Sequence, residues 1–127
     1  MKKIFQFLTM ASISLMATSC YYDELPATPV PANVSYATNI QSLFNKNCIG
    51  CHKTGATAPD LTTGNSYAAL TTATNGEKFV NAGDAAGSIL YQCMSGTGGP
   101  LMPPNGKLNA SKLALVEKWI NDGALNN

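Results

Sequence analysis

The sequence predicts an all-α domain, and three observations support this prediction. Apolar residues recur with helical spacing, as at Ile40, Leu43 and Phe44. No long stretch of the sequence alternates between apolar and polar residues in the manner of a half-buried strand. The helical stretches are short, and the segments between them are rich in Gly, Asn and Thr. We therefore expect a few short helices joined by loops.

The first helix is predicted by an apolar stripe of Tyr36, Ile40, Leu43 and Phe44, and it should end near Asn47. Residues 56–65 are expected to form a loop, and residues 66–70 to form one or two helical turns.

A third helix is predicted to begin at a cap provided by Asp84, and its inner side should carry Ile89, Leu90, Cys93 and Met94. Residues 95–100 hold three glycines and should be irregular.

The last helix has the clearest boundaries. Asn109 is expected to cap its N-terminus, and Leu108 and Leu113 occupy the positions of a hydrophobic staple. Leu113, Val116 and Ile120 keep a helical face, and Gly123 supplies the left-handed residue that ends the helix.

The chain has 127 residues, enough for one domain at most. We divide it into a signal peptide (1–19), an anchor cysteine with a proline-rich tether (20–34) and a folded domain (35–127). Aromatic residues make up 8% of the chain, which supplies few large side chains to close so small a core. A bound group would complete it.

The N-terminus predicts export from the cytoplasm. Lys2 and Lys3 precede a mixed apolar stretch at 4–17, which is shorter than the roughly 20 residues of a permanent membrane helix. The residues before Cys20 resemble a bacterial lipoprotein box, in which the cysteine is acylated. The box usually has leucine three places before the cysteine, where this chain has Ala17. Ordinary cleavage that leaves Cys20 as a thiol is the alternative.

The segment after Cys20 is expected to place the domain outside the membrane. Its three prolines within residues 25–31 favour an extended spacer. By resemblance to lipoproteins, Tyr21 in place of aspartate implies the outer membrane, facing the periplasm. The pair Asp23 and Glu24 leaves the cell surface as an alternative.

Charge excludes one class of partner. Without the signal peptide the chain keeps six lysines and seven carboxylates, and it has no arginine. Because no basic run remains to neutralise phosphates, we expect no nucleic-acid binding.

The pentapeptide at residues 48–52 carries the chemistry. Cys48 and Cys51 have the spacing that reaches two vinyl groups of a porphyrin, and His52 follows directly to bind its iron. The motif therefore predicts one covalent haem c. A zinc site of Cys48, Cys51, His52 and Cys93 is the main alternative, although adjacent cysteine and histidine ligands fit a tetrahedron poorly. A thiol redox motif would need a βαβ unit, which the sequence does not indicate.

With this motif the chain resembles the class I cytochrome c superfamily, and in particular its small bacterial monohaem members. The resemblance covers residues 36–124. It is carried by the helix that runs into the motif (40–52), Ser-Ile-Leu-Tyr at 88–91, Leu-Met-Pro-Pro at 101–104 and the closing helix with Trp119, Ile120, Gly123 and Ala124. It implies a few helices wrapped around one haem, with His52 and a methionine as axial ligands.

Met102 is the predicted distal ligand, because Pro103 and Pro104 stiffen the loop that carries it. Met94 is the rival, although a methionine beside Cys93 on a helix is more often core filling. An open sixth position is the third alternative.

Five further residues have open roles. Cys93 is expected to be a buried thiol, with a Cys20–Cys93 disulfide as the alternative if Cys20 is not acylated. Trp119 and Tyr91 are expected to be core aromatics that could also contact a haem edge or propionate. With no arginine present, Lys53, Lys107 or backbone N–H groups would have to bind the propionates.

These features predict an electron carrier between extracytoplasmic redox partners, and no catalytic activity of its own. Two alternatives remain: a haem-based sensor or enzyme with an open or displaceable sixth position, and a structural lipoprotein with a zinc-type site.

Overall fold

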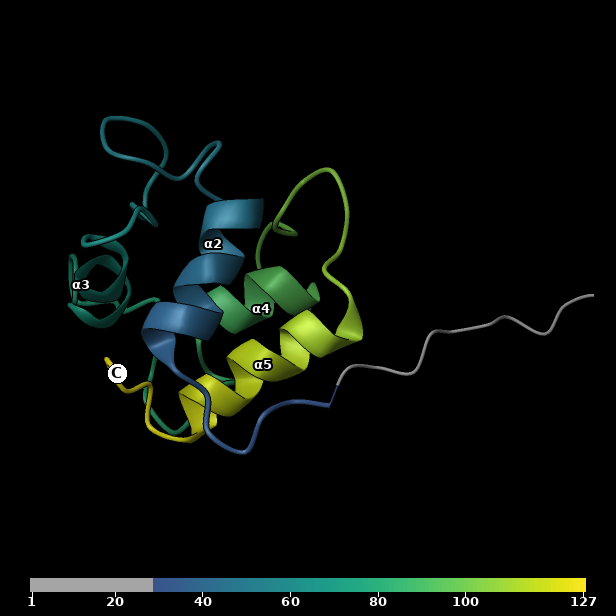
Figure 1. Cartoon of the computed structure of the whole chain (residues 1–127). Helices are drawn as coiled ribbons and strands as arrows, with labels where there is room; N and C mark the ends of the chain where they lie inside the picture. Colours follow the sequence, from purple (N-terminus) through teal and green to yellow (C-terminus); the bar gives the residue numbers. More distant parts are fainter. Residues whose placement is uncertain (1–28) are drawn as a thin grey trace, which may run out of the picture.

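The computed structural model describes residues 29–127 (Figure 1). The predicted signal peptide at 1–19 and the predicted anchor at Cys20 lie outside these residues. In the described part the helical elements are η1 (Tyr36–Ile40), α2 (Gln41–Asn47), α3 (Ser66–Thr71), α4 (Ile89–Ser95) and α5 (Ala110–Asn121). Residues 29–127 contain two isolated β-bridges and no strand. The all-α prediction is confirmed.

The first predicted helix is present as η1 followed directly by α2. Ser35 caps η1, since its hydroxyl oxygen accepts from the backbone N–H of Thr38 at 3.3 Å. The helix ends at Asn47, as expected, and the N–H of Cys48 still donates to the carbonyl of Phe44 at 2.8 Å. The Cys48–His52 motif thus begins at the C-terminus of a helix whose apolar face is buried.

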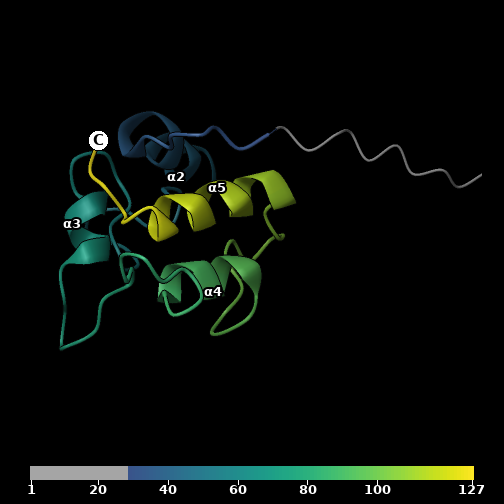
Figure 2. The ribbon, with the colours of Figure 1, turned by 90° about the horizontal axis from the view of Figure 1, so that it is seen from below.

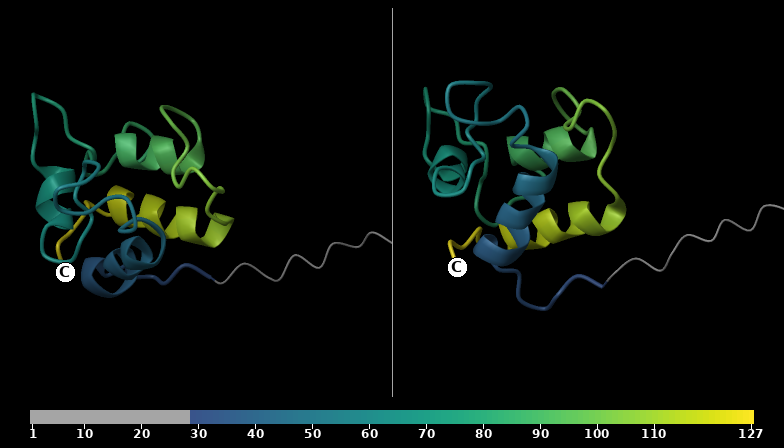
Figure 3. Two further views of the ribbon diagram at one scale, coloured as in Figure 1. Left: turned by 90° about the horizontal axis from the view of Figure 1, so that it is seen from above. Right: turned by 45° about the horizontal axis from the view of Figure 1, so that its top comes forward.

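Helix α5 lies between η1/α2 and α4, as Figures 2 and 3 show from opposite sides, and it contacts both η1 and α4. Both predicted ends are confirmed. Asn109 accepts from the N–H of Lys112 at 3.0 Å. Gly123 adopts a φ of +105°, a conformation that is strained for other residues. Leu108 is buried, and Leu113 is half-buried against the core.

The predicted cap of the third helix is wrong. Helix α4 begins four residues later than Asp84 implies, with Ser88 at the N-cap position. Asp84 instead accepts from the N–H of Gly87 at 2.8 Å, and its carbonyl accepts from the hydroxyl of Ser88 at 2.7 Å. An aspartate closes a local turn as readily as it caps a helix, and the sequence does not separate the two.

Tyr36 is the centre of the core. Its ring centroid lies 5.1 Å from that of Tyr67 and 5.2 Å from that of Trp119, and 6.5 Å from that of Phe44. These contacts join η1, α2, α3 and α5 around one aromatic cluster. Aromatic pairs in such edge-on or tilted arrangements add about 0.5–1.5 kcal/mol beyond the area they bury.

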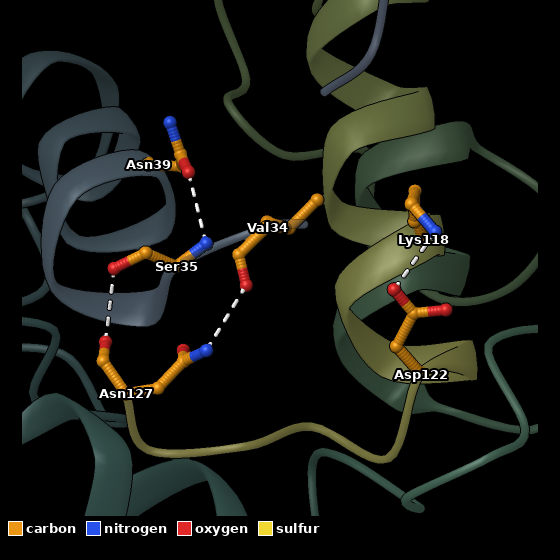
Figure 4. A network of polar contacts seen from close by, with 6 residues as sticks. All are labelled: Val34, Ser35, Asn39, Lys118, Asp122 and Asn127. Carbon is orange, nitrogen blue, oxygen red and sulfur yellow. Dashed lines mark hydrogen bonds and ion pairs between the residues drawn. The ribbon is translucent and has the colours of Figure 1, made fainter. Parts of the chain in front are cut away.

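The two ends of the described chain are tied together (Figure 4). The hydroxyl of Ser35 donates to the carbonyl oxygen of Asn127 at 3.0 Å, and the backbone N–H of Ser35 donates to Asn39 at 2.9 Å. Nearby, Lys118 and Asp122 form an ion pair at 2.9 Å on the surface of α5. The hydrogen bond between Ser35 and Asn127 fixes where the chain enters the domain. Within residues 29–127, every helix is too short or too polar to cross a bilayer.

Candidate functional site

A cavity of about 780 Å³ opens at the end of the molecule where α2 finishes. Its volume is in the range of sites that enclose a small molecule or cofactor, about 300–1,000 Å³. The walls come from the turn after α2, the loop before α3, the segment between α3 and α4, helix α4 and the loop between α4 and α5. Most of the lining is apolar, and it includes Leu61, Phe79, Ile89, Leu90, Met94, Pro100, Pro103, Pro104 and Leu108.

Cys48, Cys51 and His52 all line this cavity. They come together because the chain turns sharply after α2: the N–H groups of Cys51 and His52 both donate to the carbonyl of Cys48, at 3.1 and 2.9 Å. Cys51 is exposed and Cys48 is half-buried. Burial raises the pKa of the Cys48 thiol to about 11, although the Lys112 ammonium opposes the shift. Cys48 is therefore a neutral thiol at neutral pH.

The imidazole of His52 is oriented by a single backbone group. Its Nδ1 lies 3.2 Å from the carbonyl oxygen of Pro59. A carbonyl oxygen only accepts, so this hydrogen bond requires the proton to be on Nδ1. The lone pair of Nε2 is then free to bind a metal, in the arrangement that commonly holds metal-ligating histidines.

Met102 lies in the loop between α4 and α5 and also lines the cavity. The loop is tied to α4, because the N–H of Met102 donates to the carbonyl of Cys93 at 3.0 Å. Gly96 ends α4 in the left-handed conformation. Gly99 has a φ of +69°, and a Cβ there would lie 3.0 Å from the sulfur of Cys93. Close packing against α4 thus sets the path of the chain leading to Met102.

Met94 and Cys93 face the same cavity from α4. Met94 is only 3% exposed and belongs to the core, whereas Met102 and Cys93 are half-buried. Met94 therefore packs in the core, as expected for a methionine at a buried helix position. Of the four residues expected on the inner side of α4, Leu90 and Met94 are buried, and Ile89 and Cys93 form part of the cavity wall.

The four residues of the zinc alternative do not form a metal site. Cys48, Cys51, His52 and Cys93 all line the cavity. Across residues 29–127, however, no three His, Cys, Asp or Glu side chains come close enough together to hold a metal ion. The Cys20–Cys93 disulfide stays untested, since Cys20 lies outside the described residues.

The polar groups of Trp119 and Tyr91 are engaged away from the cavity. Trp119 is 1% exposed, and its Nε1–H donates to the carbonyl of Leu125 at 2.9 Å. The hydroxyl of Tyr91 donates to Glu117 at 3.1 Å, and this bond joins α4 to α5. Neither aromatic residue lines the cavity, which agrees with their expected role in the core.

Neither lysine proposed for the propionates lines the cavity: Lys53 and Lys107 are both exposed. The lysine with a link to the cavity wall is Lys112, whose ammonium donates at 3.1 Å to the side chain of Asn47. Asn47 and Asn105 supply polar lining. The sequence patterns gave none of these three residues a role at the cavity, because their side-chain contacts depend on the tertiary structure.

Pro59, Asp60 and Leu61 are the most important residues that the sequence motifs did not indicate. Pro59 orients His52, and Leu61 is buried and forms part of the cavity wall. Asp60 accepts four hydrogen bonds from its own loop. An aspartate among threonines and asparagines signals a local turn, but it does not show which other residues the turn will contact.

One family model matches most of the folded domain. Its description is "Cytochrome C oxidase, cbb3-type, subunit III", and it covers residues 36–120. The match begins at the first residue of η1 and ends one residue before the end of α5, so it includes every element that lines the cavity. Neither the curated proteins nor the solved structures gave a match.

Proposed function

We propose that this chain, which belongs to the class I cytochrome c family, carries single electrons between extracytoplasmic redox partners. Membership of this family implies covalently bound haem c. Bound haem supplies one-electron chemistry at its iron. The name of the matched family refers to an oxidase subunit. A carrier module is compatible with such an assembly, because it supplies electrons without itself reducing oxygen.

One observation carries the proposal: the residues of the attachment motif and Met102 line the same apolar cavity. Cys48 and Cys51 offer two thiols at a half-buried and an exposed position for thioether bonds. His52 offers Nε2 to the iron, because Nδ1–H is held by Pro59. This set of donors fits a haem attached through thioethers, with His52 as its proximal ligand.

For the distal ligand we propose Met102. It sits on a loop and is half-buried at the cavity, whereas Met94 is almost fully buried in the core. The thioether of Met102 can turn toward a bound iron without the loss of any helix packing. An iron with both axial positions filled exchanges electrons and offers no site for a substrate.

The attachment is tested by mass spectrometry of protein made together with haem-attachment enzymes. The wild type should gain the mass of one haem. Cys48→Ala and Cys51→Ala should each lose one thioether bond. Cys93→Ala is the matched control, because this third cysteine also lines the cavity and should retain both bonds. A mature wild-type chain with no added haem mass contradicts the proposed function.

The distal ligand is tested by two methionine variants. Met102→Ala should lower the reduction potential and abolish the sulfur-to-iron charge-transfer band of the oxidised protein, because the soft ligand that favours the reduced state is lost. Met94→Ala should leave the band in place and reduce the free energy of unfolding by about 2–5 kcal/mol, as for other buried methionines. The reverse pattern would assign the ligand to Met94. If neither variant changes the spectrum and carbon monoxide binds to the reduced wild type, the sensor or enzyme alternative is favoured.

We also propose that Cys20 is acylated and that the domain stands outside the cytoplasm, where cytochrome c domains typically function. The domain begins at Ser35, and η1 and α2 together place twelve residues between Ser35 and Cys48. At about 1.5 Å per residue the seven residues of α2 alone rise roughly 10 Å, and η1 adds to this length. The tether would thus enter the domain far from the attachment motif. Cys20→Ala should release a soluble domain that retains its haem, and a wild-type protein that is soluble and carries no lipid mass would contradict the anchor.

A further inference from the structure

His52 makes two hydrogen bonds with one short segment of the loop that follows it: it donates one and accepts the other. The carbonyl oxygen of Pro59 accepts from Nδ1 of the ring, at 3.2 Å. The N–H of Leu61 donates to the backbone carbonyl of His52, at 3.0 Å. Asp60 lies between these two residues. What holds Asp60 in place therefore also holds the Pro59 carbonyl that His52 contacts.

The carboxylate of Asp60 is held from both ends of the loop. Its Oδ2 accepts from the hydroxyl of Thr54 at 2.6 Å and from the amide of Asn65 at 3.1 Å. Its Oδ1 accepts from both the hydroxyl and the backbone N–H of Thr62, at 2.6 and 3.0 Å. Four bonds to one charged group are strong, because hydrogen bonds to an ionised acceptor are about twice as strong as neutral ones. They close residues 54–65 into a loop around Asp60.

The same segment is also anchored to helix α2. The side-chain amide of Gln41 donates to the carbonyl of Leu61 at 3.0 Å, and Leu61 is 3% exposed. The loop therefore has one attachment in the core and one at the carboxylate of Asp60. Loss of the second attachment would free Pro59, while Leu61 would stay in place.

We propose that Asp60 is a positioning residue for His52: its carboxylate holds the Pro59 carbonyl against the imidazole, and this contact tunes the reduction potential of the haem. The proposal rests on the proposed binding of iron by His52. A hydrogen bond from Nδ1–H to a carbonyl increases the electron density on Nε2, which favours the oxidised iron. When the Pro59 carbonyl moves away, the oxidised state loses more than the reduced state, and the potential rises.

Removing the negative charge of Asp60 would raise the potential as well, so Asp60→Asn alone does not separate the two causes. The double variant Thr54→Val with Thr62→Val does. It removes the two shortest bonds to the carboxylate, retains the charge of Asp60 and keeps side chains of nearly equal size. Thr54→Ser with Thr62→Ser is the matched control, because it keeps both hydroxyl donors.

The experiment uses the haem-loaded full chain and has two readouts. The first is the ratio of reduced to oxidised protein at a fixed solution potential. The valine pair should raise this ratio by about threefold, which is about 28 mV at 59 mV per tenfold change. The second is the exchange rate of the His52 Nδ1 proton by NMR, which should increase by roughly tenfold as the protecting bond opens. The serine pair should match the wild type in both.

Asp84→Asn controls for charge, because Asp84 is a carboxylate that is bonded to Gly87 and lies outside the His52 loop. It should leave the exchange rate of the His52 proton unchanged. If the valine pair is too unstable, Asn65→Ala is the replacement. It removes the 3.1 Å bond to Asp60 together with a 3.2 Å bond to the hydroxyl of Thr62, and it should shift both readouts in the same direction.

Two results would overturn the proposal. In the first, the valine pair binds haem normally and matches the wild type in both readouts. In the second, Asp60→Asn and Asp84→Asn raise the ratio equally and neither alters proton exchange, which would leave charge as the whole effect. Either result would leave the proposed function intact. A wild-type chain that binds no haem would instead contradict the proposed function and this proposal together.

Discussion

Replacing Ser66 by alanine should destabilise the domain far more than the loss of one small side chain implies. Ser66 is 1% exposed, and its hydroxyl joins two other buried polar groups. It accepts from the hydroxyl of Tyr36 at 2.6 Å and donates to the side-chain oxygen of Gln41. Tyr36 and Gln41 are themselves only 5% and 6% exposed. In Ser66→Ala both groups therefore lose their partner in a place that water does not reach.

The magnitude follows from counting unsatisfied groups. Each buried donor or acceptor left without a partner costs about 1–3 kcal/mol, so Ser66→Ala should reduce the free energy of unfolding by about 2–6 kcal/mol. The better helix propensity of alanine in α3 offsets about 0.5 kcal/mol of this. Tyr36→Phe removes one hydrogen bond and leaves Ser66 bonded to Gln41, so it should cost only about 0.5–1.5 kcal/mol.

Guanidinium unfolding of the haem-loaded protein, followed by far-UV circular dichroism, measures both variants and their combination. Adding Tyr36→Phe to Ser66→Ala should cost nothing further, because the tyrosine hydroxyl no longer needs a partner. Equal costs for the two single variants, or strictly additive costs in the double variant, would refute the role of Ser66 as the group shared by Tyr36 and Gln41.

Two further predictions follow from single positions. Gly99→Ala should destabilise the protein by more than the roughly 1–2 kcal/mol of a left-handed backbone, because its Cβ would also lie 3.0 Å from the sulfur of Cys93. Gly64→Ala, with φ +90° and no neighbour within 4 Å, should show the backbone cost alone, and equal effects in urea unfolding would contradict this reasoning. The hydroxyl of Thr54 and three further hydrogen bonds lower the pKa of Asp60 from 3.8 to about 2. The stability that this carboxylate contributes should therefore be complete above about pH 4 and lost as the pH falls through 2, so that Asp60→Asn flattens the acid dependence of stability in this range. An unchanged acid profile would contradict it.

The helices were predictable from the sequence because their signals are local. The stripe of Tyr36, Ile40, Leu43 and Phe44 occupies one helical face, and all four side chains are buried. The cap at Asn109 involves a partner three residues away. Helix signals of this kind can be recognised without knowledge of the tertiary structure.

The polar interior of the domain was not predictable in the same way. Gln41 falls on the helix that carries the apolar stripe. Besides Asn45 on the same helix, its partners are Leu61 and Ser66, twenty and twenty-five residues away. Both partners belong to segments with weak helical signals or none. Asp84 shows the related ambiguity within a short segment, since its side chain closes a turn where a helix cap was expected.

The Cys48–His52 motif can be recognised in the sequence, whereas part of the cavity wall around it cannot, for one physical reason. Cys48, Cys51 and His52 are recognised by spacing, because one cofactor fixes their separation. The wall around them includes Leu61 and Phe79, which come from loops whose positions depend on contacts distant in sequence.

The distribution of polar groups has a further consequence for the proposed carrier. The hydrogen-bonding groups of Tyr91 and Trp119 are satisfied by Glu117 and Leu125, so neither aromatic residue needs to turn toward the cavity. The cavity keeps a mainly apolar wall. Such a wall disfavours the extra positive charge of an oxidised iron, because little polar surface is available to solvate it. The hydrogen bond from His52 to Pro59 acts in the opposite direction, since it strengthens the ligand that favours the oxidised state. The reduction potential of the haem is therefore expected to depend on two opposing contributions. The apolar wall raises it and depends on core packing, whereas the Pro59 carbonyl lowers it and depends, in our proposal, on Asp60.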